Sequence, residues 1–154
     1  MFGDGLAACG LDRAYGAYLD EVPGYTLAVN NAMSLLGLHR RLRAASMGHL
    51  GAFEATSSLP CRRIAGGIRR LGLAEEAAAY FDEHVEADAV HEQLAFRDIC
   101  AELARQEPAL TEDLFFGAAV CLYLDRVAAE EMLARWEGGR STLREVGDAE
   151  AVAS

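Results

Sequence analysis

A long segment without helix breakers constrains the fold of this chain more than any other feature. Residues 75–106 contain no glycine and no proline, and alanine, leucine and glutamate recur throughout. These residues are strong helix formers, and acidic Glu75 and Glu76 suit the first turn of a helix. β-branched residues, which favour strands, are scarce along the whole chain. The sequence therefore predicts an all-α fold built around one long helix.

Glycine and proline divide the preceding part of the chain into helical pieces. A first short piece is expected to end at Gly10, and a second, over residues 11–21, ends before Pro23. Residues 25–58 have a helical pattern that predicts a third piece, with a possible break near Gly37.

A serine-rich stretch predicts a helix boundary before Pro60, because serine can cap a helix and proline can open one. The helix that begins there is expected to stop at Gly72. After the long helix, Pro108 resets the chain, and a last helix is expected to reach about Trp136. Short connections between long amphipathic helices predict an antiparallel helical bundle.

Composition and charge limit the organisation and the partners of the chain. Its 154 residues are enough for one domain. We expect a helical domain over residues 1–137 and a polar, flexible tail over residues 138–154. The net charge of −10 disfavours nucleic acid and anionic membranes as partners. No apolar run approaches the roughly 20 residues that span a bilayer. The four cysteines are far apart, and without a signal sequence they indicate free thiols in the cytoplasm.

Three polar side chains share one face of the helix predicted over residues 75–106. With about 100° per residue, His84, Asp88 and His91 fall within an arc of roughly 60° that apolar residues flank. Burying two imidazoles and a carboxylate without partners is costly, and a bound cation would compensate all three. The alternative is an aspartate and a histidine that satisfy each other in the core. Two histidines on either side of an inward aspartate favour the metal site.

A single carboxylate, Glu54, lies in small and apolar surroundings on the preceding helix. Leu50 and Gly51 share its predicted face, so that face is expected to be buried. A carboxylate there needs a cation or a hydrogen-bond donor. Arg43 lies near the same face and offers an ion pair as the alternative to a metal. We interpret His49, which lies about 140° around the helix from Glu54, as a residue that packs in the core or supports a metal ligand.

Three consecutive blocks of the sequence are informative together: residues 48–58, 67–72 and 81–92. Together they resemble the iron-containing redox enzyme family, which comprises the heme-oxygenase-like diiron oxidases and oxygenases. The similarity extends from about residue 10 to residue 140 and is more specific than the spacing of the two histidines and the aspartate. It implies an all-α bundle of the heme-oxygenase-like type. The resemblance is to the C-terminal half of the family, so the N-terminal helices are expected to be lacking.

The resemblance also implies a function, namely a non-heme diiron enzyme that activates O2 to oxidise a small organic substrate. It implies metal binding by His84, Asp88 and His91, and by Glu54 on the preceding core helix. In the family, the N-terminal half supplies further ligands. We therefore expect iron, dinuclear if the ligand shell is completed, and a homo-oligomer or a partner chain that covers exposed apolar faces. The alternative function is a truncated, non-catalytic helical paralogue or assembly subunit with one metal or none.

Overall fold

Helices account for the regular structure in the computed structural model, which describes residues 1–144 apart from the side chain of Ala89. No strand occurs in this described range, which confirms the predicted all-α class. The elements in chain order are α1 (Phe2–Ala8), η1 (Leu19–Glu21), α2 (Gly24–Leu38), η2 (Arg40–Leu42), α3 (Arg43–Arg70), α4 (Glu75–Gln93), η3 (Leu94–Ala101), α5 (Glu102–Gln106), η4 (Pro108–Leu110) and α6 (Thr111–Glu137). Of these, η3 is a π-helix, and η1, η2 and η4 are single 3-10 turns.

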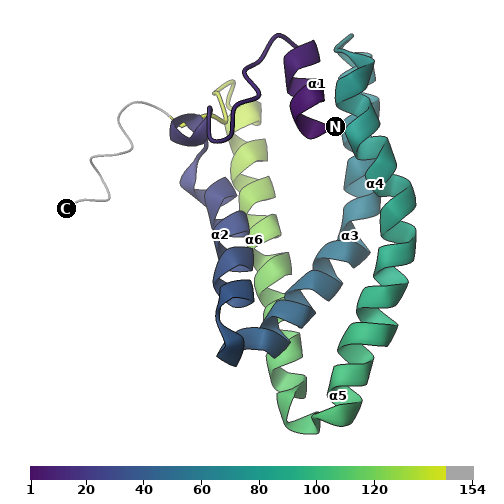
Figure 1. Cartoon of the computed structure of the whole chain (residues 1–154). Helices are drawn as coiled ribbons and strands as arrows, with labels where there is room; N and C mark the ends of the chain where they lie inside the picture. The colour runs from purple at the N-terminus through teal and green to yellow at the C-terminus, as the bar shows by residue number, and fades with distance from the viewer. Residues whose placement is uncertain (145–154) are drawn as a thin grey trace, which may run out of the picture.

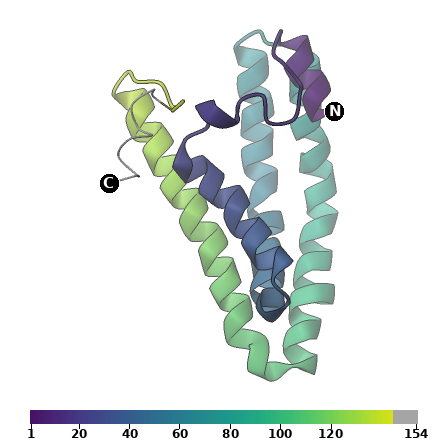
Figure 2. The same cartoon turned by 60° about the vertical axis from the view of Figure 1, so that its left-hand side comes forward.

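The central element of the bundle is α3. It packs against α4 on one side and against α6 on the other (Figure 1). The shorter α2 lies beside α6, and α1 lies beside the first turns of α4. Figure 2 shows that α6 and α4 come together at the α5 end and diverge toward the opposite end. None of the helices within residues 1–144 has the length and hydropathy of a membrane span.

Two glycines bring the backbones of α3 and α6 into direct contact. A Cβ atom on Gly48 would lie 1.8 Å from the carbonyl oxygen of Leu114, and one on Gly117 would lie 1.8 Å from that of Ala45. No side chain fits at such distances, so the two helices can approach this closely only with glycine at both positions. This crossing fixes where α6 lies along α3.

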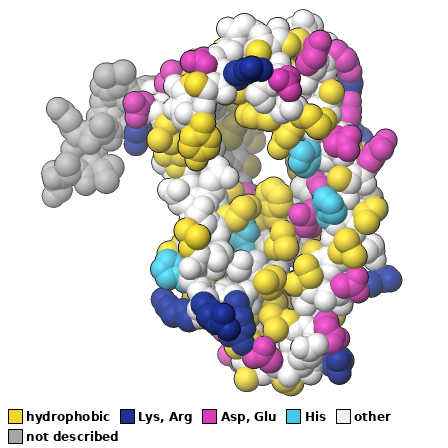
Figure 3. All heavy atoms as spheres, viewed as in Figure 1, with side chains coloured by type: hydrophobic (Ala, Val, Ile, Leu, Met, Phe, Trp, Pro, Cys, Tyr) yellow, Lys and Arg dark blue, Asp and Glu magenta, His cyan; other side chains and the backbone are white. Residues whose placement is uncertain are grey.

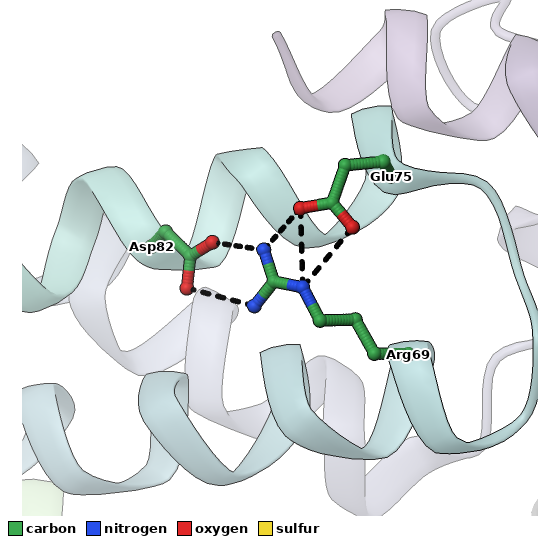
Figure 4. A network of polar contacts seen from close by, with 3 residues as sticks. All are labelled: Arg69, Glu75 and Asp82. Atoms are coloured by element: carbon green, nitrogen blue, oxygen red, sulfur yellow. Dashed lines mark hydrogen bonds and ion pairs between the residues drawn. The ribbon is translucent and has the colours of Figure 1, made fainter.

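The end of α3 is joined to the start of α4 by Arg69 (Figure 4). Its guanidinium donates hydrogen bonds to both carboxylate oxygens of Glu75 and to Asp82, with 2.5 Å between Arg69 Nη2 and Asp82 Oδ2. These hydrogen bonds lower the pKa of Glu75 and of Asp82. Between the two helices, Gly72 has a φ of 69°, as is usual just beyond the end of a helix. The turn and its ion pairs therefore set the register of α4 along α3.

The predicted helix boundary at Pro60 is wrong, because α3 continues through this residue. A proline inside a helix removes a backbone hydrogen bond and costs about 3 kcal/mol. Side chains before it tie the helix together and to its neighbour. Thr56 Oγ1 donates to the carbonyl oxygen of Ala52 over 2.7 Å, and Ser58 Oγ donates to that of Val85 over 3.2 Å. Packing along α4 thus outweighs the local effect of the proline.

The predicted helix over residues 11–21 is also wrong, since only the short η1 forms there. Gly10 and Gly16 adopt φ values of 77° and 79°, which no right-handed helix contains. In addition, Asp12 Oδ1 accepts the backbone N–H of Ala14 over 2.8 Å. Such a local bond offers the backbone an alternative to the helix.

The other predicted boundaries agree with the structure. The break expected near Gly37 occurs at the end of α2, and the helical segment from Glu75 runs on through η3 and α5. Residues 138–144 of the predicted tail follow α6, and the division into a helical domain and a flexible tail stays a prediction. Within these residues, the carbonyl oxygen of Thr142 accepts a hydrogen bond from Tyr25 and the N–H of Arg144 donates one to Glu21. Residues 145–154 of the tail lie outside the described residues.

Candidate metal centre

Three of the four predicted ligands meet between α3 and α4. Glu54, Asp88 and His91 each place one ligand atom within 4.8 Å of the other two. His91 Nδ1 lies 3.4 Å from Glu54 Oε2 and 3.7 Å from Asp88 Oδ1, and neither approach is a hydrogen bond. With metal–ligand bonds of about 2.0–2.2 Å, atoms bound to one ion lie at comparable distances from one another. The two distances from His91 are therefore compatible with one shared cation.

Neither carboxylate of the group forms an ion pair with an arginine in the described residues, and one Glu54 oxygen has no hydrogen-bond partner. Asp88 is 4% exposed and accepts a hydrogen bond from Ser57 Oγ. Glu54 Oε2 is buried, and nothing in the described part of the chain forms a hydrogen bond with it. Arg43, the alternative partner, pairs instead with Glu107 over 2.5 Å. Because an unpartnered buried carboxylate oxygen is costly, the residues present fit a site that binds a cation.

His91 lies at the accessible side of the group. Its side chain is 52% exposed, whereas Asp88 and the Oε2 atom of Glu54 are buried. Figure 3 shows histidine and acidic side chains next to hydrophobic ones on the α4 side of the molecule. Two carboxylates and one imidazole are three protein ligands, which would leave coordination positions open on most divalent metals.

The fourth predicted ligand, His84, is not part of this group. Its Nδ1 lies 2.7 Å from the carbonyl oxygen of Tyr80, and the centroids of the two rings are 4.4 Å apart. A carbonyl can only accept, so Nδ1 carries the proton and Nε2 keeps its lone pair. Metal-binding histidines are commonly held in this way by a backbone carbonyl. The role of His84 as a ligand stays a prediction.

Two features of the site were not predicted from the sequence. A serine of the stretch before Pro60 was expected to cap a helix, but Ser57 lies within α3 and donates a hydrogen bond to Asp88. Its position, about 60° around α3 from Glu54, is the signal that could have revealed this contact. The second feature is the π-helix η3, which begins shortly after His91. π-Helices are rare and frequently occur at functional sites, but no pattern in the sequence predicts this one.

The remaining histidines lie away from the group. His39 is exposed at the end of α2, where its Nδ1 lies 2.8 Å from the carbonyl oxygen of Leu35. His49 is 2% exposed in the contact with α6, and its Nε2 has no hydrogen-bond partner within residues 1–144. Burial lowers the pKa of His49, while the charge of Asp125 opposes this effect. His49 is thus buried in the core, where the neutral imidazole is favoured.

Comparisons with known proteins bear on the chemistry of this site. The family model described as iron-containing redox enzyme matches residues 1–126, a range that includes α3, α4 and all four predicted ligands. No curated protein matches the chain, and no solved structure matches it. The family match spans most of the sequence and agrees with the all-α, heme-oxygenase-like architecture. The chain therefore belongs to the iron-containing redox enzyme family.

Proposed function

We propose that this chain binds non-heme Fe2+ and acts as an oxidoreductase that uses O2 to oxidise a small organic substrate. The convergence of Glu54, Asp88 and His91 carries the proposal. Two carboxylates supply negative charge and one imidazole supplies a neutral nitrogen, a donor set that suits Fe2+. When bound, the iron supplies the redox chemistry with O2, and the protein supplies the open positions and their surroundings.

The residues of the chain have distinct roles in this proposal. Glu54 and Asp88 hold the ion from two helices, and the hydrogen bond from Ser57 orients Asp88. His91 binds the ion from the exposed side of the group. His84 has a free Nε2 one helical turn before Asp88. This position favours a ligand for a second ion over one for the first, if further ligands complete a dinuclear site.

We further propose that a second copy or a partner chain covers part of the surface. Several large apolar side chains along α2 are exposed, namely Met33, Leu35 and Leu38. Exposed large apolar side chains on a helix that packs mainly on α6 support a further contact with another chain. The covering chain could also bring the carboxylates or histidines that a second iron needs.

Anaerobic reconstitution with Fe2+ tests the proposed metal site. We expect about one tightly bound iron per chain, because the three ligands converge on one position. His91→Ala and Glu54→Gln should each lose most of this iron, since each removes a donor. His39→Ala is the matched control, because His39 is exposed and lies away from the group. If the wild-type chain binds far less than one iron, or His91→Ala binds as much, the iron site is wrong and the non-catalytic helical subunit is favoured.

Exposure of the iron-loaded protein to O2 tests the enzymatic part of the proposal. We expect the bound Fe2+ to be oxidised with a change in the visible spectrum, faster than Fe2+ in the same buffer. Retention of iron without any reaction with O2 would support a binding or assembly role instead.

A further inference from the structure

A groove of about 410 Å³ lies between α3, the η3–α5 segment and α6. Small residues of α3, including Gly51, Ala52 and Ala55, form its floor, and larger apolar side chains such as Phe96 and Phe115 form its walls. These α3 residues carry at most one side-chain carbon, so they leave space between α3 and the neighbouring helices. The result is a concave apolar surface on a chain whose net charge is −10.

Polar groups contribute little to this groove. None of its lining residues is charged. Thr56 Oγ1 donates to the carbonyl oxygen of Ala52 over 2.7 Å, and Cys100 Sγ donates to that of Met47 over 3.3 Å. Burial raises the pKa of Cys100, so the thiol stays neutral. The hydroxyl of Thr56 and the thiol of Cys100 are already hydrogen-bonded within the protein. The groove therefore mainly favours the binding of apolar groups.

The π-helix forms one wall of the groove. Phe96, Cys100 and Ala101 all belong to η3 and line the groove. A π-helix is uncommon and occurs frequently at functional sites. Where this wall meets the floor, a Cβ atom on Gly51 would lie 3.1 Å from Cys100 Sγ, so a side chain there would require Cys100 to shift slightly. A π-helix and a mid-helix glycine are both unfavourable locally, and their occurrence at one groove favours a binding site over an incidental gap.

The groove is separate from the candidate metal centre. Glu54, Asp88 and His91 do not line it. Counting about 100° per residue, Glu54 lies about 120° from Gly48 around α3, whereas Gly51 and Ala52 lie within about 60° of Gly48. Gly51 lies only about 60° from Glu54, so the groove adjoins the face of α3 that carries Glu54, and its lining residues distinguish it from the metal centre.

We propose that this groove binds an uncharged, hydrocarbon-rich small molecule. Ligand pockets typically measure roughly 300–1,000 Å³ and are mostly apolar, and a cavity of about 150 Å³ already holds benzene. Phe115 at the edge is 73% exposed, so the groove is open on one side. A ligand with a polar end can keep that end in water while its apolar body lies on the floor. The inference does not depend on the proposed iron chemistry, because no proposed iron ligand lines the groove.

Binding of N-phenyl-1-naphthylamine, a neutral apolar fluorophore, tests this proposal. We expect saturable binding by the wild-type chain with about one site per chain. Ala118→Leu places extra carbons inside the groove and should weaken binding at least about tenfold. Ala119→Leu is the matched control on the same helix, since Ala119 is exposed and does not line the groove. It should leave the affinity within about twofold of wild type.

A second filling variant guards against a folding defect in the first. Ala104→Leu enters the groove from α5, and both variants are first checked for wild-type helical content by circular dichroism. If both fold and bind the fluorophore as the wild-type chain does, the proposal is wrong. His91→Ala should retain binding, which separates this result from failure of the iron site.

The competing occupant is a second copy of the chain. If the protein is a dimer that does not bind the fluorophore, and Phe115→Glu yields a monomer that does, the groove is a self-association surface. Light scattering after size-exclusion chromatography measures this, and that outcome would overturn the small-molecule proposal.

Discussion

Ser57 donates a hydrogen bond from its Oγ to Asp88 Oδ2 and so connects α3 to α4 next to Glu54. Replacing it with alanine leaves Asp88 in place but removes the group that orients its carboxylate. Loss of such a supporting bond typically weakens metal binding roughly 10–100-fold. We expect Ser57→Ala to weaken Fe2+ binding by this amount, measured anaerobically by competition with a chelator of known affinity.

The neighbouring serine supplies the control for this measurement. Ser58 Oγ also bonds α4, but to the carbonyl oxygen of Val85 and not to a proposed ligand. Ser58→Ala should therefore keep the wild-type iron affinity. Equal affinities for Ser57→Ala, Ser58→Ala and wild type would show that Asp88 does not need this bond or does not bind iron.

The crossing of α3 and α6 predicts a large difference between two glycine substitutions. In Gly117→Ala the new Cβ would lie 1.8 Å from the carbonyl oxygen of Ala45, and only a shift of the helices relieves this. We expect the free energy of unfolding to fall by about 1–3 kcal/mol or more. At Gly66, also in a helix, nothing lies within 4 Å of the added carbon.

Gly66→Ala should raise the free energy of unfolding by about 0.5–1 kcal/mol, because alanine is the better helix former. Urea unfolding followed by circular dichroism measures both variants. If Gly117→Ala is as stable as Gly66→Ala, the backbones of α3 and α6 are not in contact.

The buried His49 predicts that acid destabilises the fold. Burial lowers its pKa in the folded chain below the ordinary value of 6.5, which the unfolded chain keeps. The unfolded state therefore takes up the proton first as the pH falls. The free energy of unfolding is therefore unaffected by His49 above about pH 6.5 and decreases as the pH falls below this value.

The measurement is the melting temperature of metal-free wild type and His49→Gln between about pH 8 and pH 5. The variant should lose less stability on acidification. Asp125 acts in the opposite sense, because burial raises its pKa and its protonation favours the folded state. Asp125→Asn therefore serves as a second comparison. Parallel curves for wild type and His49→Gln would contradict the prediction.

Cys121 should be chemically inert in the folded chain. Burial, and then the nearby charge of Asp125, raise the pKa of its thiol to about 11. At pH 8 roughly one thiol in a thousand is then the reactive thiolate. We expect alkylation of Cys121 by iodoacetamide, followed by peptide mass spectrometry, to be far slower in the native chain than in concentrated urea. Equal rates in the two conditions would show that the thiol is accessible in the folded state.

Helix periodicity predicted which side chains α3 and α4 turn toward each other, whereas their binding of a metal stays a prediction. Glu54, Asp88 and His91 converge because each lies on the face that its helix turns toward the other. His84 lies on the same arc, but its ring bonds the carbonyl oxygen of Tyr80 in its own helix. A helical wheel gives the direction of a side chain and not its rotamer, so this difference could not be predicted.

Local rules failed where contacts distant in sequence outweigh them. Pro60 is an ordinary signal for a helix start, yet Ser58 and its contact with α4 keep α3 continuous. Propensity is a weak predictor when tertiary packing opposes it. The π-helix from Leu94 to Ala101 could not be predicted for a related reason, because its residues are ordinary helix formers and its geometry depends on neighbouring elements.

The candidate metal ligands lie on two helices whose connecting turn is closed by Arg69. An ion bound by Glu54, Asp88 and His91 would act as a cross-link that only the folded chain can form. Linkage then requires that the ion stabilise the fold, by an amount that grows with its affinity and concentration. Removal of iron by a chelator should lower the melting temperature together with the metal content. The melting temperature of a sample would then indicate what fraction of its protein molecules carries iron.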